Sequence, residues 1–508
     1  MRARVAGGHR TVVVLAVATV VLRLPLLGAP EGADEGGYLA VARQWHGAGP
    51  SLYGHYWVDR PPLLIALFQL CAALGGMPAV RVLGALAAAV AVLGVAEAAR
   101  LLAGGRAAVA GAGLAAALFV SPQLGTVQVN GELLSAPFVA WSVALWLRAV
   151  PVGGGGQPVR SRAAASALGA GALAASALLV KQNMVDPLVF GAVAGLVAWR
   201  AAVVRGSELR RAVAYVAGGF ASALVVVGAW TVVRGASLAG VFDAMYPFRV
   251  RAAGVLATLP DQGQADRSVV FLHTCITSGL VLVVGAFAWE LVRRRVAGPG
   301  AWGLSALLVW ATVSIVVSGG FWDHYLVQAI VPVATAGGVA LGSTELGRGV
   351  RAHLLPAVAG ATVVVVAATH WTLAWGSTMS YRGASAGRAI GAVAAPGDTM
   401  ISVMGDAETV EVSGLTSPYP YLWTLPAQVD DPHLDRLVAL LAGSGAPTWV
   451  VPWNRPSFQP PVLQRVADVL AAHYRQVGVI CGLPVLLHDG VTRATPPAEP
   501  CSGRLTNW

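Results

Sequence analysis

Long apolar segments separated by short polar loops fill the chain up to about residue 375. A helix that crosses a bilayer needs about 20 predominantly apolar residues. We predict about eleven such helices, because apolar segments of roughly this length recur along the chain. They lie at 11–28, 79–102, 106–122, 132–150, 163–180, 184–204, 211–233, 268–291, 301–319, 324–342 and 354–375.

Two apolar segments need separate treatment. The stretch at 62–76 is short and follows Pro61-Pro62, so we expect it to lie along the membrane interface or to re-enter. The basic N-terminus, the apolar segment after it and the small residues near Ala33 are typical of a cleaved signal peptide. We expect this segment to be retained as the first helix, because further spans follow and the polar loop after it needs tethering.

Composition agrees with a polytopic membrane protein. Of the 508 residues, 56% are hydrophobic and 11% are charged, whereas about a quarter of the residues of a typical soluble domain are charged. The net charge of +10 does not indicate a nucleic-acid partner. Most of the basic residues lie in short loops between apolar segments, where they orient the helices.

The distribution of arginine predicts the orientation in the membrane. With the N-terminus in the cytoplasm, every cytoplasmic loop is basic, as the positive-inside rule requires. An odd number of spans then places the chain from about residue 376 onward on the outer side. The arginines of the cytoplasmic loops are Arg100, Arg106, Arg148, Arg160, Arg162, Arg200, Arg205, Arg210, Arg211, Arg293, Arg294, Arg295, Arg348 and Arg351.

The C-terminal part has a different pattern, in which short apolar segments alternate with amphipathic ones. We predict strands at 399–405, 446–453 and 477–488 and helices at 432–443 and 461–474. The fold class is therefore a polytopic α-helical membrane domain followed by a small extracytoplasmic α/β domain. We place the membrane domain at 1–375, with its first outer loop at 30–78, and the α/β domain at 376–508.

The C-terminal domain contains no nucleophile elbow, phosphate loop or metal-spaced cluster in its sequence, so we expect a rigid cap that helps to bind an acceptor. Cys71 and Cys275 lie in or beside apolar segments, where cysteine acts as a small hydrophobic residue. Cys481 and Cys501 either form a disulfide or remain two thiols, because their spacing alone does not decide.

The loop around residues 32–67 carries the most unusual polar residues. Asp34 and Glu35 stand side by side, and Asp59 precedes Arg60-Pro61-Pro62. Carboxylates beside membrane segments are costly without a function or a partner. We interpret the loop as part of an active site at the outer face, although Asp34 and Glu35 also suit a helix N-cap and Asp59 also suits a pair with Arg60 or Arg81.

Other polar residues fall on the same side in the predicted topology. Each has a structural alternative: a helix cap for Glu132, an interfacial lysine for Lys181, lipid headgroup contacts for the arginines and an interfacial ring for the histidine. We predict instead that they contribute to a cavity that opens outward. These residues are Glu132, Lys181, Arg249, Arg251, His324 and Tyr325.

The chemistry that suits this set is sugar transfer from a lipid-linked phosphate donor. Asp34 would take the proton of the acceptor, and Lys181, Arg249 and Arg251 would hold the departing phosphate. A single displacement would invert the anomeric centre. The sequence identifies no certain cofactor. Asp59 and His324 are candidate ligands of a divalent metal ion, although no spacing shows such a site.

The first loop resembles that of the GT-C class of membrane glycosyltransferases, closest to the protein O-mannosyltransferase and lipid A aminoarabinose transferase superfamily. The matching residues are Asp34, Glu35, Tyr38, Asp59, Arg60, Pro61, Pro62 and Arg81. The resemblance covers about 10–345 and implies that Asp34 is the catalytic base. It also implies that Lys181 closes a short outer turn and that 321–334 forms an outer helix start. Glu132 departs from the usual aspartate, and 234–268 has no counterpart that aligns.

The donor is thus expected to be a polyprenyl-phosphate sugar, and the acceptor a lipid, a glycan or a protein. The alternative function is a secondary transporter or flippase. Transporters often contain internal repeats and broken helices near the bilayer midplane. The sequence has no convincing repeat, and its acidic residues lie in the outer loops.

Overall fold

The computed structural model describes residues 2–150, 160–258, 264–342, 354–375, 381–453 and 457–501. The chain divides into two compact units. The first unit comprises Met1–Leu27, Arg81–Val227 and Gln264–Gly376, and the second comprises Gly28–Val80, Gly228–Gly263 and Ser377–Trp508. The first outer loop therefore clusters with the C-terminal residues.

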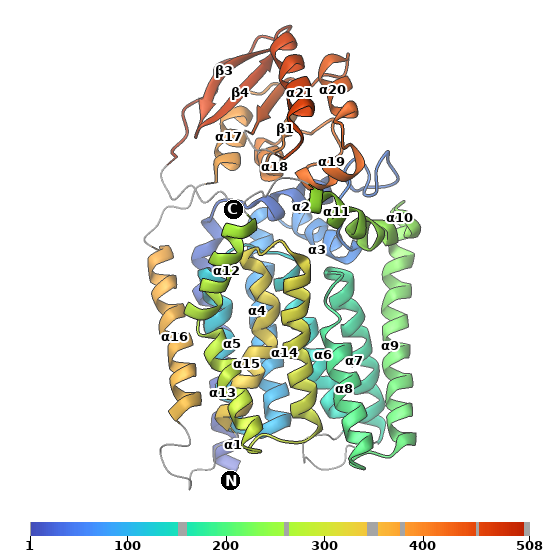
Figure 1. The fold of residues 1–508 in the computed structure, drawn as a ribbon, viewed down its shortest axis with the longest axis vertical. Coiled ribbons are helices and arrows are strands. Elements are labelled where there is room, and N and C mark those ends of the chain that lie inside the picture. The colour runs from blue at the N-terminus through green and yellow to red at the C-terminus, as the bar shows by residue number, and fades with distance from the viewer. Residues whose placement is uncertain are drawn as a thin grey trace. The chain divides into compact units, whose positions relative to one another are not determined.

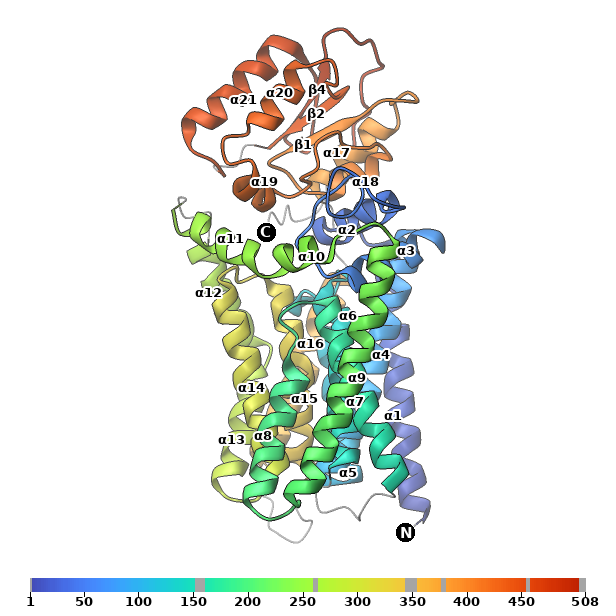
Figure 2. The ribbon, with the colours of Figure 1, turned by 90° about the vertical axis from the view of Figure 1, so that its right-hand side faces the viewer.

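The first unit is a bundle of long helices that run side by side (Figures 1 and 2). A helix lies in each of the eleven predicted segments, with the segment at 268–291 occupied by a bent pair. The helices are α1 (Arg2–Arg23), α4 (Met77–Ala103), α5 (Gly105–Val120), α6 (Gly131–Ala149), α7 (Arg160–Val180), α8 (Asp186–Arg200), α9 (Gly206–Val233), α12 (Gln264–Thr277), α13 (Leu280–Val292), α14 (Pro299–Ser318), α15 (Val327–Gly342) and α16 (Leu354–Trp375).

Six of the described helices are long and apolar enough to cross a membrane, and α12 with α13 adds a seventh if that pair, bent by 57°, is one span. Glycine allows close packing inside the bundle. A Cβ at Gly171 of α7 would lie 1.9 Å from the carbonyl oxygen of Val216 of α9, and one at Gly219 would lie 1.9 Å from that of Leu168. Small residues of this kind are typical of contacts between membrane helices.

The outer faces of the bundle are apolar as well. Val225 and Val226 of α9 are 68% and 67% exposed. Such surfaces are unfavourable in water but suit contact with lipid chains. The protein is thus a multi-pass membrane protein.

The second unit contains four helices from the first outer loop and the segment after α9, and an α/β part. The helices are α2 (Ala33–Gln44), α3 (Pro62–Ala73), α10 (Leu238–Met245) and α11 (Pro247–Thr258). The α/β part runs α17 (Arg382–Gly391), β1 (Met400–Val403), α18 (Glu408–Ser413), α19 (Thr424–Asp430), α20 (Asp435–Ala442), β2 (Trp449–Pro452), α21 (Pro460–His473), β3 (Tyr474–Ile480) and β4 (Leu483–His488).

The sheet confirms the predicted α/β class and corrects one strand. Its order is β1-β2-β4-β3, with β1 and β2 parallel and β4 antiparallel to both of its neighbours. The single strand predicted at 477–488 is wrong, because the segment turns back on itself at Cys481 and Gly482. These residues have φ of 49° and 76°, which is typical of the tight turns that join hairpin strands.

The structure also decides between the two predictions for the C-terminal cysteines. Cys481 at the hairpin turn forms a disulfide with Cys501. Cys71 and Cys275 are free, and Cys71 is buried as predicted for a small hydrophobic residue. The disulfide fixes the last described residues to the β3–β4 turn.

Candidate active site

The predicted catalytic carboxylate lies at the start of α2. The helix N-cap is Gly32, so the alternative of Asp34 or Glu35 as the N-cap residue is wrong. Glu35 is fully buried, and its Oε2 accepts a hydrogen bond from the backbone N–H of Gly32 at 3.3 Å. Asp34 is half-buried in the first helical turn, where the helix dipole favours a negative charge.

Asp59 holds two arginines that are far apart in the sequence. The residue is buried, with 7% of its surface exposed. Its Oδ1 accepts a hydrogen bond from Nη1 of Arg60 at 2.7 Å, and its Oδ2 forms an ion pair with Arg249 of α11. The alternative prediction of a pair with Arg60 is confirmed, and Arg249 joins it. Asp59 therefore connects the first outer loop to α11.

Tyr38 of α2 fixes the orientation of Arg60. The tyrosine hydroxyl accepts a hydrogen bond from Nε of Arg60 at 2.7 Å, and the guanidinium lies 5.5 Å from the ring centroid. The ring packs against Phe68 and Trp423, with centroids 5.4 and 5.6 Å apart. A Cβ at Gly37 would lie 2.2 Å from Cζ2 of Trp423, so glycine is needed for this contact. No motif around Trp423 predicts this contact.

Arg251 has different partners from Arg249. Its two Nη atoms each lie 2.9 Å from the carboxylate of Asp243 in α10, and Nη2 lies 3.7 Å from Asp430 at the end of α19. The hydrogen bonds from Arg251 lower the pKa of Asp243. Burial raises the pKa of Asp430, although Arg251 opposes the rise. Arg251 therefore connects three helices.

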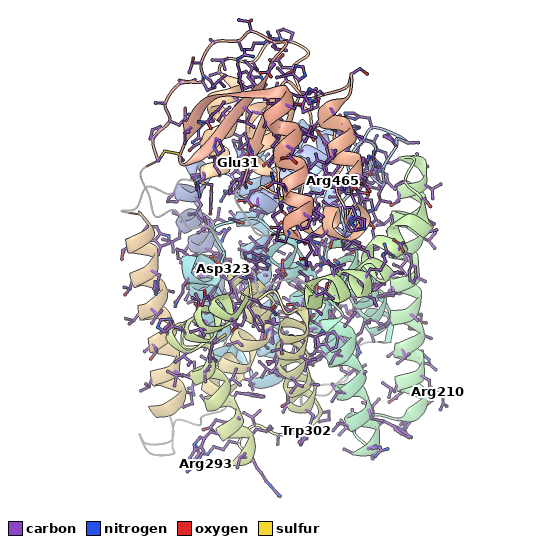
Figure 3. All side chains as sticks on the ribbon, turned by 45° about the horizontal axis from the view of Figure 1, so that its top comes forward. Glu31, Arg210, Arg293, Trp302, Asp323 and Arg465 are labelled. Carbon is purple, nitrogen blue, oxygen red and sulfur yellow. A yellow bond between two sulfur atoms is a disulfide. The ribbon has the colours of Figure 1, made fainter. Side chains whose placement is uncertain are left out.

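A second cluster of predicted residues forms in the first unit. Nζ of Lys181, in the turn after α7, lies 2.6 Å from Oε1 of Glu132 at the start of α6, and both side chains are buried. Nζ also lies 5.4 Å from the ring centroid of Tyr325, and the ring of His324 packs edge-on against Tyr325 at 4.8 Å. Both rings belong to a short 3-10 helix, Asp323–Leu326; Figure 3 labels Asp323.

Two glycines make room for this cluster. A Cβ at Gly131 would lie 2.9 Å from Cδ of Lys181, and one at Gly125 would lie 2.6 Å from the backbone N of His324. The N-cap of α6 is Asn130, whose side chain accepts a hydrogen bond from the N–H of Leu133 at 2.9 Å. Asn130 is therefore the cap of α6, and the alternative in which Glu132 caps this helix is wrong.

A buried polar network beside Lys181 was not predicted. Asp186 is fully buried and accepts hydrogen bonds from Nε2 of Gln328 at 3.1 and 3.3 Å. Nδ2 of Asn183 donates to Oε1 of Gln328 at 3.0 Å and to Ser314 at 2.8 Å. The network ties the turn after α7 to α15. An aspartate inside the predicted span 184–204 was the available signal, because buried charges in membrane helices are usually functional or paired.

The predicted metal ligands, Asp59 and His324, lie in different units. Among the residues that the structure describes, no group of three or more His, Cys, Asp or Glu side chains is arranged to hold a metal ion. A metal site at these two residues stays a prediction.

Comparisons with known proteins agree with the resemblance seen in the sequence. A model of the family described as dolichyl-phosphate-mannose-protein mannosyltransferase matches residues 59–230, which include Asp59, Arg60, Glu132 and Lys181. No curated protein sequence gives a significant match.

Two solved structures have a similar fold. ArnT from Cupriavidus metallidurans bound to undecaprenyl phosphate is 16% identical with a TM-score of 0.60, over 93% of this chain and 96% of that chain. The archaeal oligosaccharyltransferase AglB from Archaeoglobus fulgidus, in complex with an inhibitory peptide and a dolichol-phosphate, is 13% identical with a TM-score of 0.51, over 88% and 69% of the two chains. The predicted resemblance to the GT-C class and the predicted fold class are confirmed.

Proposed function

We propose that this protein is an inverting glycosyltransferase that moves a sugar from a polyprenyl-phosphate donor to an acceptor at the outer face of the cytoplasmic membrane. The matching family and the similar fold support this class of reaction. The observation that carries the proposal is the pair of arginines on Asp59, next to the helix that bears Asp34.

Asp34 and Tyr38 are four residues apart on α2, so they share one face of that helix. Tyr38 binds Arg60, and Arg60 shares Asp59 with Arg249. The face of α2 that carries Asp34 is therefore directed toward the arginine pair. A base and a phosphate-binding group are the two parts that the reaction requires.

In the proposed reaction, the acceptor hydroxyl attacks the anomeric carbon of the sugar, and the bond from that carbon to the phosphate oxygen breaks. The acceptor proton passes to Asp34. The phosphate has one negative charge in the donor diester and gains a second as it leaves, so the cations stabilise the transition state more than the ground state. Arg60 and Arg249 provide this positive charge, and Asp59 holds them in place.

The remaining predicted residues receive supporting roles. Glu35 closes the first turn of α2 and so orients Asp34. Arg251, predicted as a phosphate ligand, is engaged by Asp243 and holds α11 in position. Lys181, Glu132, His324 and Tyr325 contact substrate as a separate cluster.

The orientation is proposed from charge and from the disulfide. With a cytoplasmic N-terminus, the basic loops face the cytoplasm. The bond between Cys481 and Cys501 suits an oxidising compartment outside the cytoplasm.

The experiment that tests the function supplies labelled polyprenyl-phosphate sugars to membranes that contain the protein and searches for a new glycosidic bond by mass spectrometry. Transfer above the level of membranes without the protein supports the proposal. Flux of the labelled lipid in sealed vesicles without any new glycosidic bond would contradict it and support the alternative, a transporter or flippase.

A further inference from the structure

Several buried polar atoms around the Glu132–Lys181 pair have no hydrogen-bond partner among the described residues. Asn130 is 1% exposed; its side-chain oxygen caps α6, and its Nδ2 is unpartnered. Glu132 is 2% exposed; its Oε1 binds Lys181, and its Oε2 is unpartnered. Oδ1 of Asn183, two residues after Lys181, is also unpartnered.

These atoms are available to bind a ligand. Most buried polar groups in native proteins are hydrogen-bonded, and each exception needs an explanation. Leaving such groups unpaired is costly, especially for a carboxylate oxygen in a membrane helix. Asn130 and Glu132 lie at the start of α6, which the cap holds in place. Asn183 lies in the turn after α7, beside the hydrogen bonds between Asp186 and Gln328.

The mixture of donor and acceptor atoms defines the class of ligand. Nδ2 of Asn130 is a donor, whereas Oε2 of Glu132 and Oδ1 of Asn183 are acceptors. An ionised phosphate diester or monoester mainly accepts hydrogen bonds, and a carboxylate repels it. The charge of Lys181 is offset by Glu132 at 2.6 Å, so the pair offers a phosphate little net attraction. A hydroxyl group both donates and accepts, and therefore matches all three atoms.

From this arrangement we propose that Asn130, Glu132 and Lys181 form a subsite for the hydroxyl groups of a saccharide and do not bind the phosphate. The inference rests on the proposed function and changes the predicted role of Lys181 from phosphate clamp to sugar recognition. A sugar ring carries hydroxyls on neighbouring carbons, so a subsite with both donor and acceptor atoms selects both its presence and its stereochemistry.

The test variant is Asn130→Ser. Serine is a good N-cap residue, so this change retains the cap of α6 and removes the Nδ2 donor. A second variant, E132Q/K181M, replaces the buried ion pair with a neutral pair of similar size, which avoids leaving one charge unpaired. Thermal unfolding of each purified variant verifies that the fold persists.

Two constants are measured for each variant. The first is kcat/KM for transfer from a polyprenyl-phosphate sugar, with separate KM values for donor and acceptor. The second is the inhibition constant of polyprenyl phosphate, which lacks the sugar. We expect kcat/KM to fall about 10- to 100-fold, since a site built to bind a hydroxyl loses most of its discrimination when a partner is removed, while the inhibition constant changes less than about twofold.

The pattern of KM values identifies the source of the hydroxyls. A rise in the donor KM assigns the subsite to the donor sugar, and a rise confined to the acceptor KM assigns it to an acceptor saccharide. An inhibition constant that rises in parallel with the loss of transfer would overturn the inference, because the cluster would then bind phosphate. Unchanged transfer by both variants would also overturn it. A wild-type protein that neither binds polyprenyl phosphate nor transfers sugar would instead remove the proposed function itself.

Discussion

Replacing Arg249 with glutamine is expected to slow sugar transfer far more than the same change at Arg251. The two arginines lie two residues apart on α11, and their side chains are 37% and 44% exposed. They differ in their partners, because Arg249 pairs with Asp59 next to Arg60 whereas Arg251 pairs with Asp243. The pair of variants therefore separates a phosphate-binding cation from one that joins helices.

The structure allows an estimate of the size of the effect. A hydrogen bond to a charged group contributes about 1.5–3 kcal/mol, and the partial exposure of Arg249 places it toward the lower end of that range. At about 1.4 kcal/mol for each factor of ten, loss of one to two such bonds to the phosphate lowers kcat/KM about 10- to 100-fold. The loss should appear mainly in kcat, because the leaving phosphate gains charge in the transition state.

The assay measures initial rates of transfer from a labelled polyprenyl-phosphate sugar by purified protein in lipid nanodiscs. For Arg251→Gln we expect less than about a fivefold loss, since only an exposed ion pair of small energy is removed. Equal losses for the two variants, or a larger loss for Arg251→Gln, would refute the division of roles between the two arginines. A loss in Arg249→Gln that appears only in KM would refute the transition-state argument.

Two further predictions concern the second unit. Gly37→Ala places a methyl group 2.2 Å from the present position of Trp423. This change is expected to lower the free energy of unfolding by about 1–3 kcal/mol and so to lower the thermal unfolding temperature. The control Gly47→Ala has no atom within 4 Å of its Cβ and leaves the thermal unfolding temperature unchanged. Arg493→Gln is expected to destabilise the protein at pH 7. Burial opposes ionisation of Asp398, yet hydrogen bonds led by Arg493 hold its pKa below the usual value. This stabilisation is present above about pH 4 and is lost as the pH falls through the lower folded-state pKa. The difference in free energy of unfolding between Arg493→Gln and the wild type should therefore be smaller at pH 3 than at pH 7. The same difference at both pH values would contradict this role of Asp398.

Much of the membrane domain could be predicted from the sequence, because a span requires a long apolar segment regardless of its partners. The predicted span 211–233 corresponds to α9, which begins five residues earlier. Its first turn is polar, so an apolar pattern does not include it. The predicted span 268–291 is instead broken into α12 and α13. Gly279 at the break has a φ of 82°, so a glycine inside an apolar run was the available signal.

No helix is predicted from the sequence at 234–268, yet this segment contains α10 and α11. Ser237 caps α10, accepting a hydrogen bond from the N–H of Gly240 at 3.2 Å, and Pro247 begins α11. Both are ordinary helix-start residues. Two such residues do not by themselves predict two helices as short as these.

The candidate site was predicted as a list of residues, but their pairing was not. The contact of Asp59 with Arg60 is local and could be anticipated. Its contact with Arg249, and the packing of Trp423 on Tyr38, depend on tertiary structure that brings distant segments together. Sequence alone also could not separate Arg249 from Arg251, because their difference lies entirely in their partners.

The most direct test of the central claim is the rate of sugar transfer by Asp34→Asn. A general base contributes about 10²–10⁴-fold to a rate, so transfer should fall by at least about 10²-fold while the binding of polyprenyl phosphate persists. Glu35→Gln, in which an amide oxygen can still accept the hydrogen bond from Gly32, should retain most of the activity. Transfer by Asp34→Asn within about tenfold of the wild type would contradict the role of this carboxylate as the base.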